Sequence, residues 1–380
     1  MINYLSNAKP ATIRGTALLR LDFNTKDDWR MRAVLPTLNL LLRRSAKIVV
    51  LSHYGRPSPV SSADATRGRG LDKKFSLKKD AETLGRLLKK KVIFIPHFNF
   101  PVIKKMIDES PRGSIFLLEN LRFLKGEEAN DAGFAKSLAS LGDFYVNDAF
   151  AVSHRANASV AAITKLLPKY AGLELEREII SLSKAQVKPK HPLILILGGA
   201  KAGDKLGVIT YFKNKADWFL LGGGPADTIL FLEGMNVGRS VRDTDPNDLK
   251  KIKTIAKYKN IIVPEDYRWS RGAILDLGPK STQSFIKKIA KARTILWSGP
   301  LGLFEKPAFA KGDIMIAKAI IKNRRAFSIA GGGETVMFLK RYKLDKKFSF
   351  ISTGGGAMVD FLAGEKLPGI EALKQGRYNF

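Results

Sequence analysis

Short runs of leucine and β-branched residues alternate along this chain with longer amphipathic stretches. Helical patterns such as 31–43, 77–90 and 133–141 separate the runs of the first half, which lie at 17–21, 47–51, 92–95, 115–118 and 144–146. Strands that are spaced by helices form right-handed βαβ units around a parallel sheet. The alternation therefore predicts an α/β fold.

The same pattern restarts after a break. A long helix is expected from near Pro168 to Gln186, and the stretch 188–192, with two prolines, cannot continue it. New apolar runs follow at 193–197, 218–221, 260–263, 294–297, 326–329 and 348–352. With 380 residues, the chain also exceeds the roughly 250 to 300 residues at which one hydrophobic core stops growing. We therefore expect two doubly wound parallel-sheet (Rossmann-like) domains, 1–166 and 187–360, joined by a hinge helix at 167–186.

Composition excludes several classes of protein. The chain has no cysteine, so disulfides, thiolate nucleophiles and sulfur-bound metals are excluded, and any metal must be held by oxygen. The four histidines show no metal-ligand spacing, and no G-x-S-x-G sequence indicates a serine hydrolase. The first residues do not have the pattern of a secretory signal, and no apolar run approaches the ~18 residues of a membrane span. We expect a cytoplasmic protein without a membrane partner.

The formal net charge of +30 raises the question of a nucleic-acid partner. The excess of basic residues is spread over both halves, and its densest runs, 89–91 and 346–347, have no interleaved aromatic residues on which bases could stack. A generally basic surface is therefore favoured over a dedicated nucleic-acid site, and it would also favour small anionic substrates. A protein that mainly binds RNA or DNA stays an alternative.

Glycine clusters follow four of the apolar runs in the second half, at 198–199, 222–224, 331–333 and 354–356. Glycine lets the backbone approach a phosphate, and the following helix presents free N–H groups, although any one such turn can serve the fold alone. The segment 198–205 adds Lys201 and Lys205, but it does not match the P-loop pattern. Glu334 and Thr335 open a predicted helix, where they could either cap it or, for the carboxylate, bind Mg²⁺.

Polar side chains follow the apolar runs of the first half. Asp22 and Asn24, His53 and Arg56, Arg122, and finally Arg155 come after four different runs. Because the carboxyl ends of parallel strands share one edge of a sheet, these side chains should converge there, where they suit a small phosphorylated or carboxylated ligand. For any single arginine, a surface salt bridge is the competing interpretation.

The ordered segments resemble the signatures of phosphoglycerate kinases. The resemblance rests on 18–24, 52–57, 118–123, 146–150, 197–201, 297–300, 304–305 and 351–357, which occur in the family's order and span essentially the whole chain. It implies an enzyme of glycolysis and gluconeogenesis that reversibly transfers a phosphoryl group between ATP and the carboxylate of 3-phosphoglycerate. The other pair of reactants would be ADP and 1,3-bisphosphoglycerate.

The resemblance also implies roles for individual residues. Those for 3-phosphoglycerate are Asp22, Asn24, Arg30, His53, Arg56, Arg122 and Arg155. Those for the nucleotide are Gly199, Lys201, Lys205, Gly223, Pro300, Glu305, Gly331, Gly332, Gly333, Glu334 and Thr335. Among these, Arg30, Lys201 and Gly333 would be catalytic, Glu305 would bind the ribose, and Glu334 would bind the Mg²⁺ that accompanies ATP.

The family pattern further implies a monomer whose domains close around the hinge helix, with a C-terminal tail, 361–380, that returns to the N-terminal domain. The chain departs from that pattern mainly near the nucleotide. Ser298 replaces an asparagine and Glu334 an aspartate, while Pro225 and Asp227 stand where methionine and tyrosine are usual. These departures leave open whether ATP or GTP is preferred. They also leave open a catalytically weak relative with a nucleic-acid-binding or other binding role.

Overall fold

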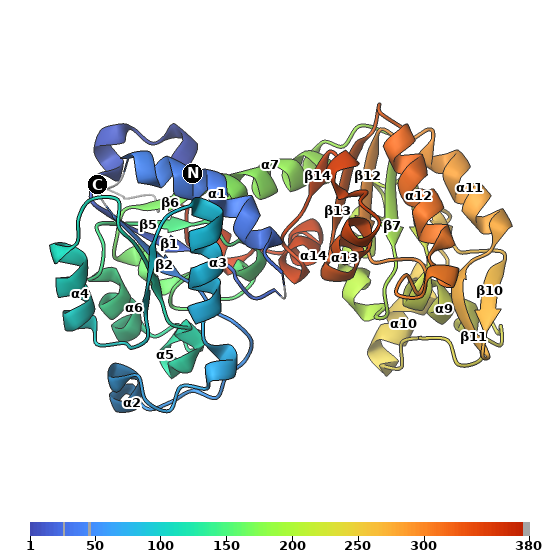
Figure 1. Ribbon diagram of the computed structural model, residues 1–380. Helices are drawn as coiled ribbons and strands as arrows, with labels where there is room; N and C mark the ends of the chain where they lie inside the picture. The colour runs from blue at the N-terminus through green and yellow to red at the C-terminus, as the bar shows by residue number, and fades with distance from the viewer. Residues whose placement is uncertain (26, 45–46, 375–380) are drawn as a thin grey trace. The chain divides into compact units, whose positions relative to one another are not determined.

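The computed structural model describes residues 1–25, 27–44 and 47–374, which form two compact units (Figure 1). The first unit comprises residues 1–178 and the C-terminal segment from residue 366, and the second comprises residues 179–365. Each unit is built around a six-stranded sheet whose paired strands are all parallel. The fold class predicted from the alternating pattern is therefore confirmed.

The sheet of the first unit has the order β3-β4-β2-β1-β5-β6. Its strands are β1 (Thr16–Arg20), β2 (Lys47–Leu51), β3 (Val92–Ile95), β4 (Ile115–Leu118), β5 (Phe144–Asn147) and β6 (Lys169–Ala171). The chain runs outward from β1 in both directions, first through β2 and later through β5. In such sheets, ligands bind beyond the carboxyl ends of the strands where the direction reverses, which here is between β1 and β5.

Helices cover both faces of this sheet. They are α1 (Trp29–Arg44), α2 (Ser62–Arg67), α3 (Lys78–Leu88), α4 (Phe100–Glu109), α5 (Lys125–Glu128) and α6 (Ala132–Ala139). On one face, the core joins Leu38 of α1 and Leu84 of α3 to Ala17 and Leu19 of β1. Leu18, which points to the opposite face, is equally buried, so β1 is apolar on both sides as a central parallel strand requires.

The helix that joins the two sheets, α7 (Leu173–Val187), begins later than the sequence pattern predicts. Lys169–Ala171 form β6 and pair with β5, so the chain is still extended where a helix was expected from near Pro168. The boundary between the compact units falls within α7, after Glu178. The helix therefore contributes residues to both units.

The C-terminal segment belongs to the first unit. Its helix α15 (Pro368–Glu371) is fixed by a hydrogen bond from Gly369 N–H to Ser153 O, and Lys374 pairs with Ile2. Leu373 is completely buried there. Residues 375–380 of the expected tail lie outside the described residues.

The sheet of the second unit has the order β14-β13-β12-β7-β8-β9, again with a change of direction, between β7 and β12. Its strands are β7 (Leu193–Leu197), β8 (Trp218–Leu221), β9 (Ile261–Ile262), β12 (Thr294–Ser298), β13 (Phe327–Gly331) and β14 (Phe350–Ile351). The antiparallel hairpin β10 (Tyr267–Ser270) and β11 (Ala273–Leu277) was not expected from the sequence.

Seven helices complete this unit: α8 (Leu206–Phe212), α9 (Gly223–Leu232), α10 (Pro246–Ile255), α11 (Pro279–Ile289), α12 (Lys311–Lys322), α13 (Gly333–Arg341) and α14 (Gly356–Leu362). Trp297 of β12 lies in the core, and its indole N–H donates to Gly299 O, which satisfies its polar atom. None of the helices that the structure describes has the length and apolarity that crossing a membrane requires.

Candidate active site

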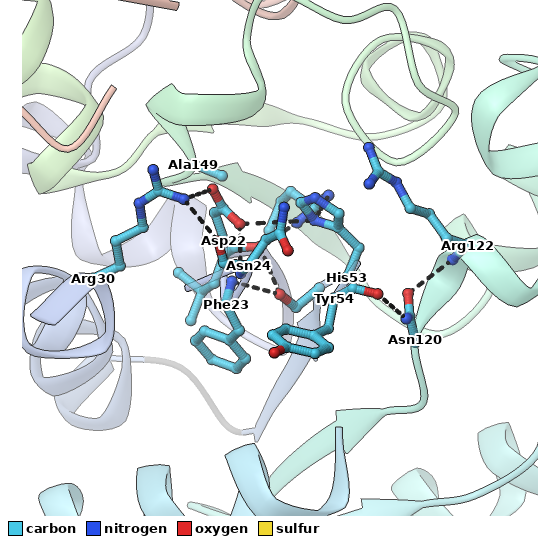
Figure 2. Close-up of polar contacts among 12 residues, drawn as sticks. Asp22, Phe23, Asn24, Arg30, His53, Tyr54, Asn120, Arg122 and Ala149 are labelled. Carbon is cyan, nitrogen blue, oxygen red and sulfur yellow. Dashed lines mark hydrogen bonds and ion pairs between the residues drawn. The ribbon is translucent and has the colours of Figure 1, made fainter. Parts of the chain in front are cut away.

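A cluster of charged side chains lies beyond β1 and β2 of the first unit, and Asp22 is at its centre (Figure 2). Arg30 from α1 places Nη1 2.5 Å from Asp22 Oδ2, and the N–H of Asn24 donates to Asp22 Oδ1 at 2.8 Å. His53 Nδ1 lies 3.8 Å from the same Oδ1. Asp22, Asn24, Arg30 and His53, which were predicted from separate segments, therefore meet at one place.

Opposing effects set the pKa of Asp22. Burial alone would raise the pKa, but the charge of Arg30, assisted by His53, the Asn24 N–H and Arg20, lowers it below its ordinary value. Asp22 is therefore ionised at neutral pH. It holds Arg30 in place as a charged partner rather than as a neutral acceptor.

Arg20 is a member of this cluster that the sequence analysis missed. It is buried in β1, where Nε donates to Ser159 Oγ at 2.8 Å and Nη2 donates to His53 Nδ1 at 3.1 Å. Because Nδ1 accepts this bond, the imidazole carries its hydrogen on Nε2. Burial lowers the pKa of His53 well below its ordinary value, only Asp22 opposes the shift, and nearby arginines add to it. A charged residue inside an apolar strand was the available signal for Arg20.

Arg122 and Asn24 hold the loop after β2 from two sides. Asn24 Oδ1 accepts from the N–H of Gly55 at 2.9 Å, while Arg122 Nη1 donates to Gly55 O at 2.6 Å. Arg30 Nε is buried without a hydrogen bond among the described residues, and Arg122 Nε, which makes no hydrogen bond there either, forms an ion pair with Glu128 Oε1 at 3.1 Å. Buried donors of this kind are uncommon unless a ligand satisfies them.

Arg155 also belongs to the cluster, whereas Arg56 does not join its hydrogen bonds. Arg155 is half-buried, and its charge contributes to lowering the pKa of both His53 and Arg122. Arg56 is exposed. The cluster as a whole brings more positive than negative charge to the edge of the sheet, and this arrangement suits a small anion.

The second unit has a cavity of about 540 Å³ beyond the carboxyl ends of β7, β12 and β13. Loops that the sequence analysis singled out line it through Gly199, Lys201, Lys205, Gly332, Gly333, Glu334 and Thr335. Gly332 precedes α13 with φ +91°, and no side chain caps this helix. The first N–H groups of α13 are therefore available to an anion.

Close backbone contact explains two of the glycines around this cavity. A Cβ on Gly198 would lie 2.1 Å from Pro300 O, and Gly299 has φ +93°. Gly198 and Gly299 therefore cannot carry side chains without displacing the backbone of the facing loop. Gly331, by contrast, does not line the cavity, because the position of its Cβ is filled by the sulfur of Met358. Its role in the structure is to let α14 pack against β13.

Two residues in the lining of the cavity, Lys205 and Thr335, form hydrogen bonds with Ser298 and Gly299 at the end of β12. Lys205 Nζ donates to Ser298 Oγ at 3.0 Å, and burial lowers the pKa of Lys205 despite the nearby Asp204 and Glu334. The buried Thr335 accepts from the N–H of Gly299 at 2.7 Å, so its hydroxyl fixes the loop after β12. Lys201 is exposed at the rim.

A smaller hollow of about 140 Å³ adjoins the cavity, and Gly199, Ala200 and Glu334 line both. Its remaining lining includes the predicted Gly223, Pro300 and Glu305 and the apolar residues Val241, Leu275, Leu301 and Leu303. Asp313 holds one wall by accepting from the N–H groups of Leu301 and Gly302 at 2.8 and 3.1 Å. Burial, with nearby Asp276 and Glu305, raises the pKa of Asp313 to about 8 against these bonds, so this carboxyl is mainly neutral at pH 7.

The carboxylates around the cavity are too few in any one place to hold a metal ion without a ligand. No group of three or more histidine or acidic side chains among the described residues is arranged to ligate a metal. Glu334 is an exposed oxygen donor in the lining. One carboxylate beside a phosphate site fits Mg²⁺, which proteins usually bind through one or two carboxylates and the substrate's phosphates.

Comparison with known proteins identifies the family. The family model described as phosphoglycerate kinase matches residues 13–365. The chain belongs to the phosphoglycerate kinase family. The phosphoglycerate kinases of Dictyoglomus turgidum and Acidobacterium capsulatum are each 40% identical to it, over 94% of this chain and 95% and 96% of their own lengths.

Solved structures of phosphoglycerate kinases agree with this assignment. The structure from Coxiella burnetii is 31% identical, with a TM-score of 0.81, and covers 98% of this chain and 99% of its own. The structure from Pyrococcus horikoshii is 30% identical, with a TM-score of 0.83, and covers 98% of both chains. The likeness therefore extends over both units.

Three of the departures from the phosphoglycerate kinase pattern lie in the lining of the cavity and the hollow: Glu334, already described, Ser298 and Asp227. Ser298 lines the cavity and accepts the hydrogen bond from Lys205, so its hydroxyl positions that lysine. Asp227 lines the hollow from α9 and is buried, with 3% of its surface exposed. The sequence analysis had noted these substitutions, but only the structure shows what each side chain contacts.

Proposed function

We propose that this protein catalyses the reversible transfer of a phosphoryl group between ATP and the carboxylate of 3-phosphoglycerate, with ADP and 1,3-bisphosphoglycerate as the other pair. Membership of the phosphoglycerate kinase family is the first support. The observation that carries most weight within the structure is the glycine-lined cavity at the start of α13, where Lys201 and Lys205 lie beside uncapped helix N–H groups. This is the chemistry of a nucleotide phosphate site.

The cluster around Asp22 would bind 3-phosphoglycerate. Arg122, Arg155 and the Nε2–H of His53 supply donors for an anion, and the buried Nε of Arg30 lacks a hydrogen bond among the described residues. A doubly anionic ligand would satisfy these donors. Asp22 and Asn24 would hold Arg30 and the Gly55 loop ready for it.

The chemical step asks little of the protein beyond alignment and neutralisation of charge. The acceptor carboxylate is already ionised, so neither a general base nor a covalent intermediate is needed. Arg30, Lys201 and the N–H of Gly333 would neutralise the transferring group, and Gly199, Lys205, Gly223, Pro300, Gly331, Gly332 and Thr335 would hold or shape the site for the nucleotide. A Mg²⁺ ion bound with the nucleotide would add positive charge at the phosphates, with Glu334 as its protein ligand.

The remaining parts of the proposal concern the chain as a whole. The first unit would bind 3-phosphoglycerate and the second the nucleotide, with Glu305 on the ribose. We propose 1–166 and 187–360 as the domains that move, with 167–186 as the hinge between them. In-line transfer requires the two ligands to meet, so we propose a closing movement about α7 that also excludes water. We further propose that the protein acts as a cytoplasmic monomer.

A coupled assay tests the proposed function. ADP formation should require both MgATP and 3-phosphoglycerate, with an enzyme that consumes the product pulling the reaction forward. Lys201→Ala should lower turnover strongly, because it removes a charge from the phosphate site, while Lys213→Ala, an exposed lysine outside the cavity, should leave it unchanged. A folded protein that shows no turnover with MgATP or MgGTP would contradict the proposal.

A further inference from the structure

Asp227 is a buried carboxyl without a hydrogen-bond partner among the residues that the structure describes. It lies in α9, and only 3% of its surface is exposed. It has no hydrogen bond or ion pair with another residue that the structure describes, whereas the buried Asp313 accepts two backbone N–H groups. The oxygens of Asp227 are not among the fully enclosed polar atoms that lack a hydrogen bond, and the residue lines a hollow, where water or a ligand can complete the carboxyl.

The carboxyl lines the small hollow beside the phosphate cavity. Apolar side chains and glycine backbones make up most of this lining, and the two other carboxylates in it, Glu305 and Glu334, are exposed. If the phosphates of a nucleotide occupy the larger cavity, then its flat base can occupy the hollow, because the two share Gly199 and Ala200. Asp227 is then the buried polar group available to the edge of the base.

The two protonation states of a carboxyl recognise different bases. An ionised carboxylate only accepts hydrogen bonds, so it complements guanine, which presents N1–H and N2–H side by side. A protonated carboxyl has one donor and one acceptor, and this pair complements N1 and the N6 amino group of adenine. A tyrosine, which the family usually has here, carries a single hydroxyl and cannot make this distinction.

We propose that Asp227 determines the nucleobase specificity of this kinase, and that its ionised form favours guanine nucleotides over adenine nucleotides. This inference rests on the proposed nucleotide site in the second unit. The inference adds to that site a residue that selects between two substrates of the same reaction.

The surroundings of Asp227 make the selection depend on pH. Burial raises the pKa of Asp227 to about 7. Three titratable groups among the described residues face it: Tyr267 of β10 and, across the hollow, the exposed Glu305 and Glu334. Burial and nearby carboxylates, including Asp227, raise the pKa of Tyr267 to about 12. No lysine or arginine contributes to the described lining of the hollow, so no cation holds the carboxyl ionised. The preference for guanine should therefore increase as pH rises through neutrality.

Binding measurements on the full chain test the proposal without requiring turnover. Dissociation constants for MgADP and MgGDP are measured by calorimetry at about pH 6 and about pH 8, below and above the transition. We expect the affinity ratio of GDP to ADP to rise at least about fivefold over this interval, since the ionised carboxylate gains charge-assisted hydrogen bonds. Glu233→Gln, which removes an exposed carboxylate at the end of the same helix, is the matched control and should keep this rise.

Two variants make the outcome decisive. Asp227→Asn cannot ionise but keeps the shape of the side chain, so it should retain ADP binding and show a ratio that does not change with pH. Asp227→Leu should weaken GDP binding at the higher pH by at least about tenfold. Nucleotide binding with a ratio that is independent of pH and insensitive to both variants would overturn the role of Asp227 alone. Wild-type protein that binds neither nucleotide would overturn the proposed function and this inference together.

Discussion

Replacing Arg30 by alanine tests the candidate anion site most directly. Arg30 Nη1 bonds to the buried Asp22 at 2.5 Å, and the arginine side chain is 16% exposed. Losing a donor that acts on the transferring group costs about 10²- to 10³-fold in kcat. The lost ion pair costs about 1 to 2 kcal/mol in stability, less than for a fully buried pair because Arg20 and the Asn24 N–H still compensate Asp22.

The stability effect should also have a defined pH dependence. The folded-state pKa of Asp22 lies below its unfolded value, so the stabilisation is present above the unfolded pKa and is lost as pH falls through the folded pKa. Removing Arg30 raises the folded pKa. Acid unfolding of Arg30→Ala should therefore begin at a higher pH than that of the wild type.

Steady-state kinetics at saturating substrates and urea unfolding measure the two effects separately. Arg32→Ala is the matched control, because Arg32 lies on the same helix, is 60% exposed and pairs only with Asp28 of the exposed surface in the described structure. Such a pair contributes little, so this variant should keep nearly full kcat. If Arg30→Ala kept more than about half of the wild-type kcat, the catalytic role of Arg30 would be refuted.

Three further predictions concern stability and are measured by thermal or denaturant unfolding. Gly331→Ala should destabilise the second unit by about 1 to 3 kcal/mol, since the new Cβ would meet the sulfur of Met358 at 2.2 Å. The control Gly333→Ala has open space around its Cβ and should not destabilise the unit. Equal effects of the two substitutions would contradict the packing argument. Leu373→Ala should cost the first unit about 2 to 4 kcal/mol, while Leu166→Ala, at 44% exposed, should cost little, and a stable Leu373 variant would mean that the C-terminal segment does not anchor there. The pKa of Asp313 in the folded protein is raised to about 8, so the stability that the neutral carboxyl contributes is complete below the unfolded pKa and declines as pH rises. Asp313→Asn, which cannot ionise, should therefore lose about 1 to 2 kcal/mol less stability than the wild type between about pH 6 and pH 8. An identical pH profile of stability in wild type and variant would exclude this titration.

The alternating pattern was enough to predict the fold class, because period and length distinguish buried strands from amphipathic helices. Most strand positions were predicted to within two residues. The errors have physical causes. Lys169–Ala171 carry no strong strand signal and become β6 only because β5 has a free edge beside them. The hairpin of β10 and β11 was missed because most of its residues are half-exposed and only Asp276 and Leu277 are buried, so no regular alternation marks the strands.

The candidate site was predictable to the same degree. Glycines and charged residues directly after apolar runs predicted two gatherings of candidate site residues, because the carboxyl ends of parallel strands share one edge of a sheet. Local sequence could not show which of these groups face the ligand space. Gly331 does not line the cavity, since Met358 fills the position of its Cβ, and Arg20 was overlooked but donates to His53.

The sequence by itself determined the two parallel sheets and the edges at which polar groups gather, since both follow from periodicities and residue types that act over a few neighbouring positions. Only the tertiary structure decided which groups meet. Arg20 bonds to Ser159, which follows β5, Gly198 packs against Pro300, and Asp227 lines a hollow together with residues of several loops. The contacts of Arg20 and Gly198 join residues more than a hundred positions apart. The geometry of all three places follows from the packing of whole strands and helices, which no local pattern specifies.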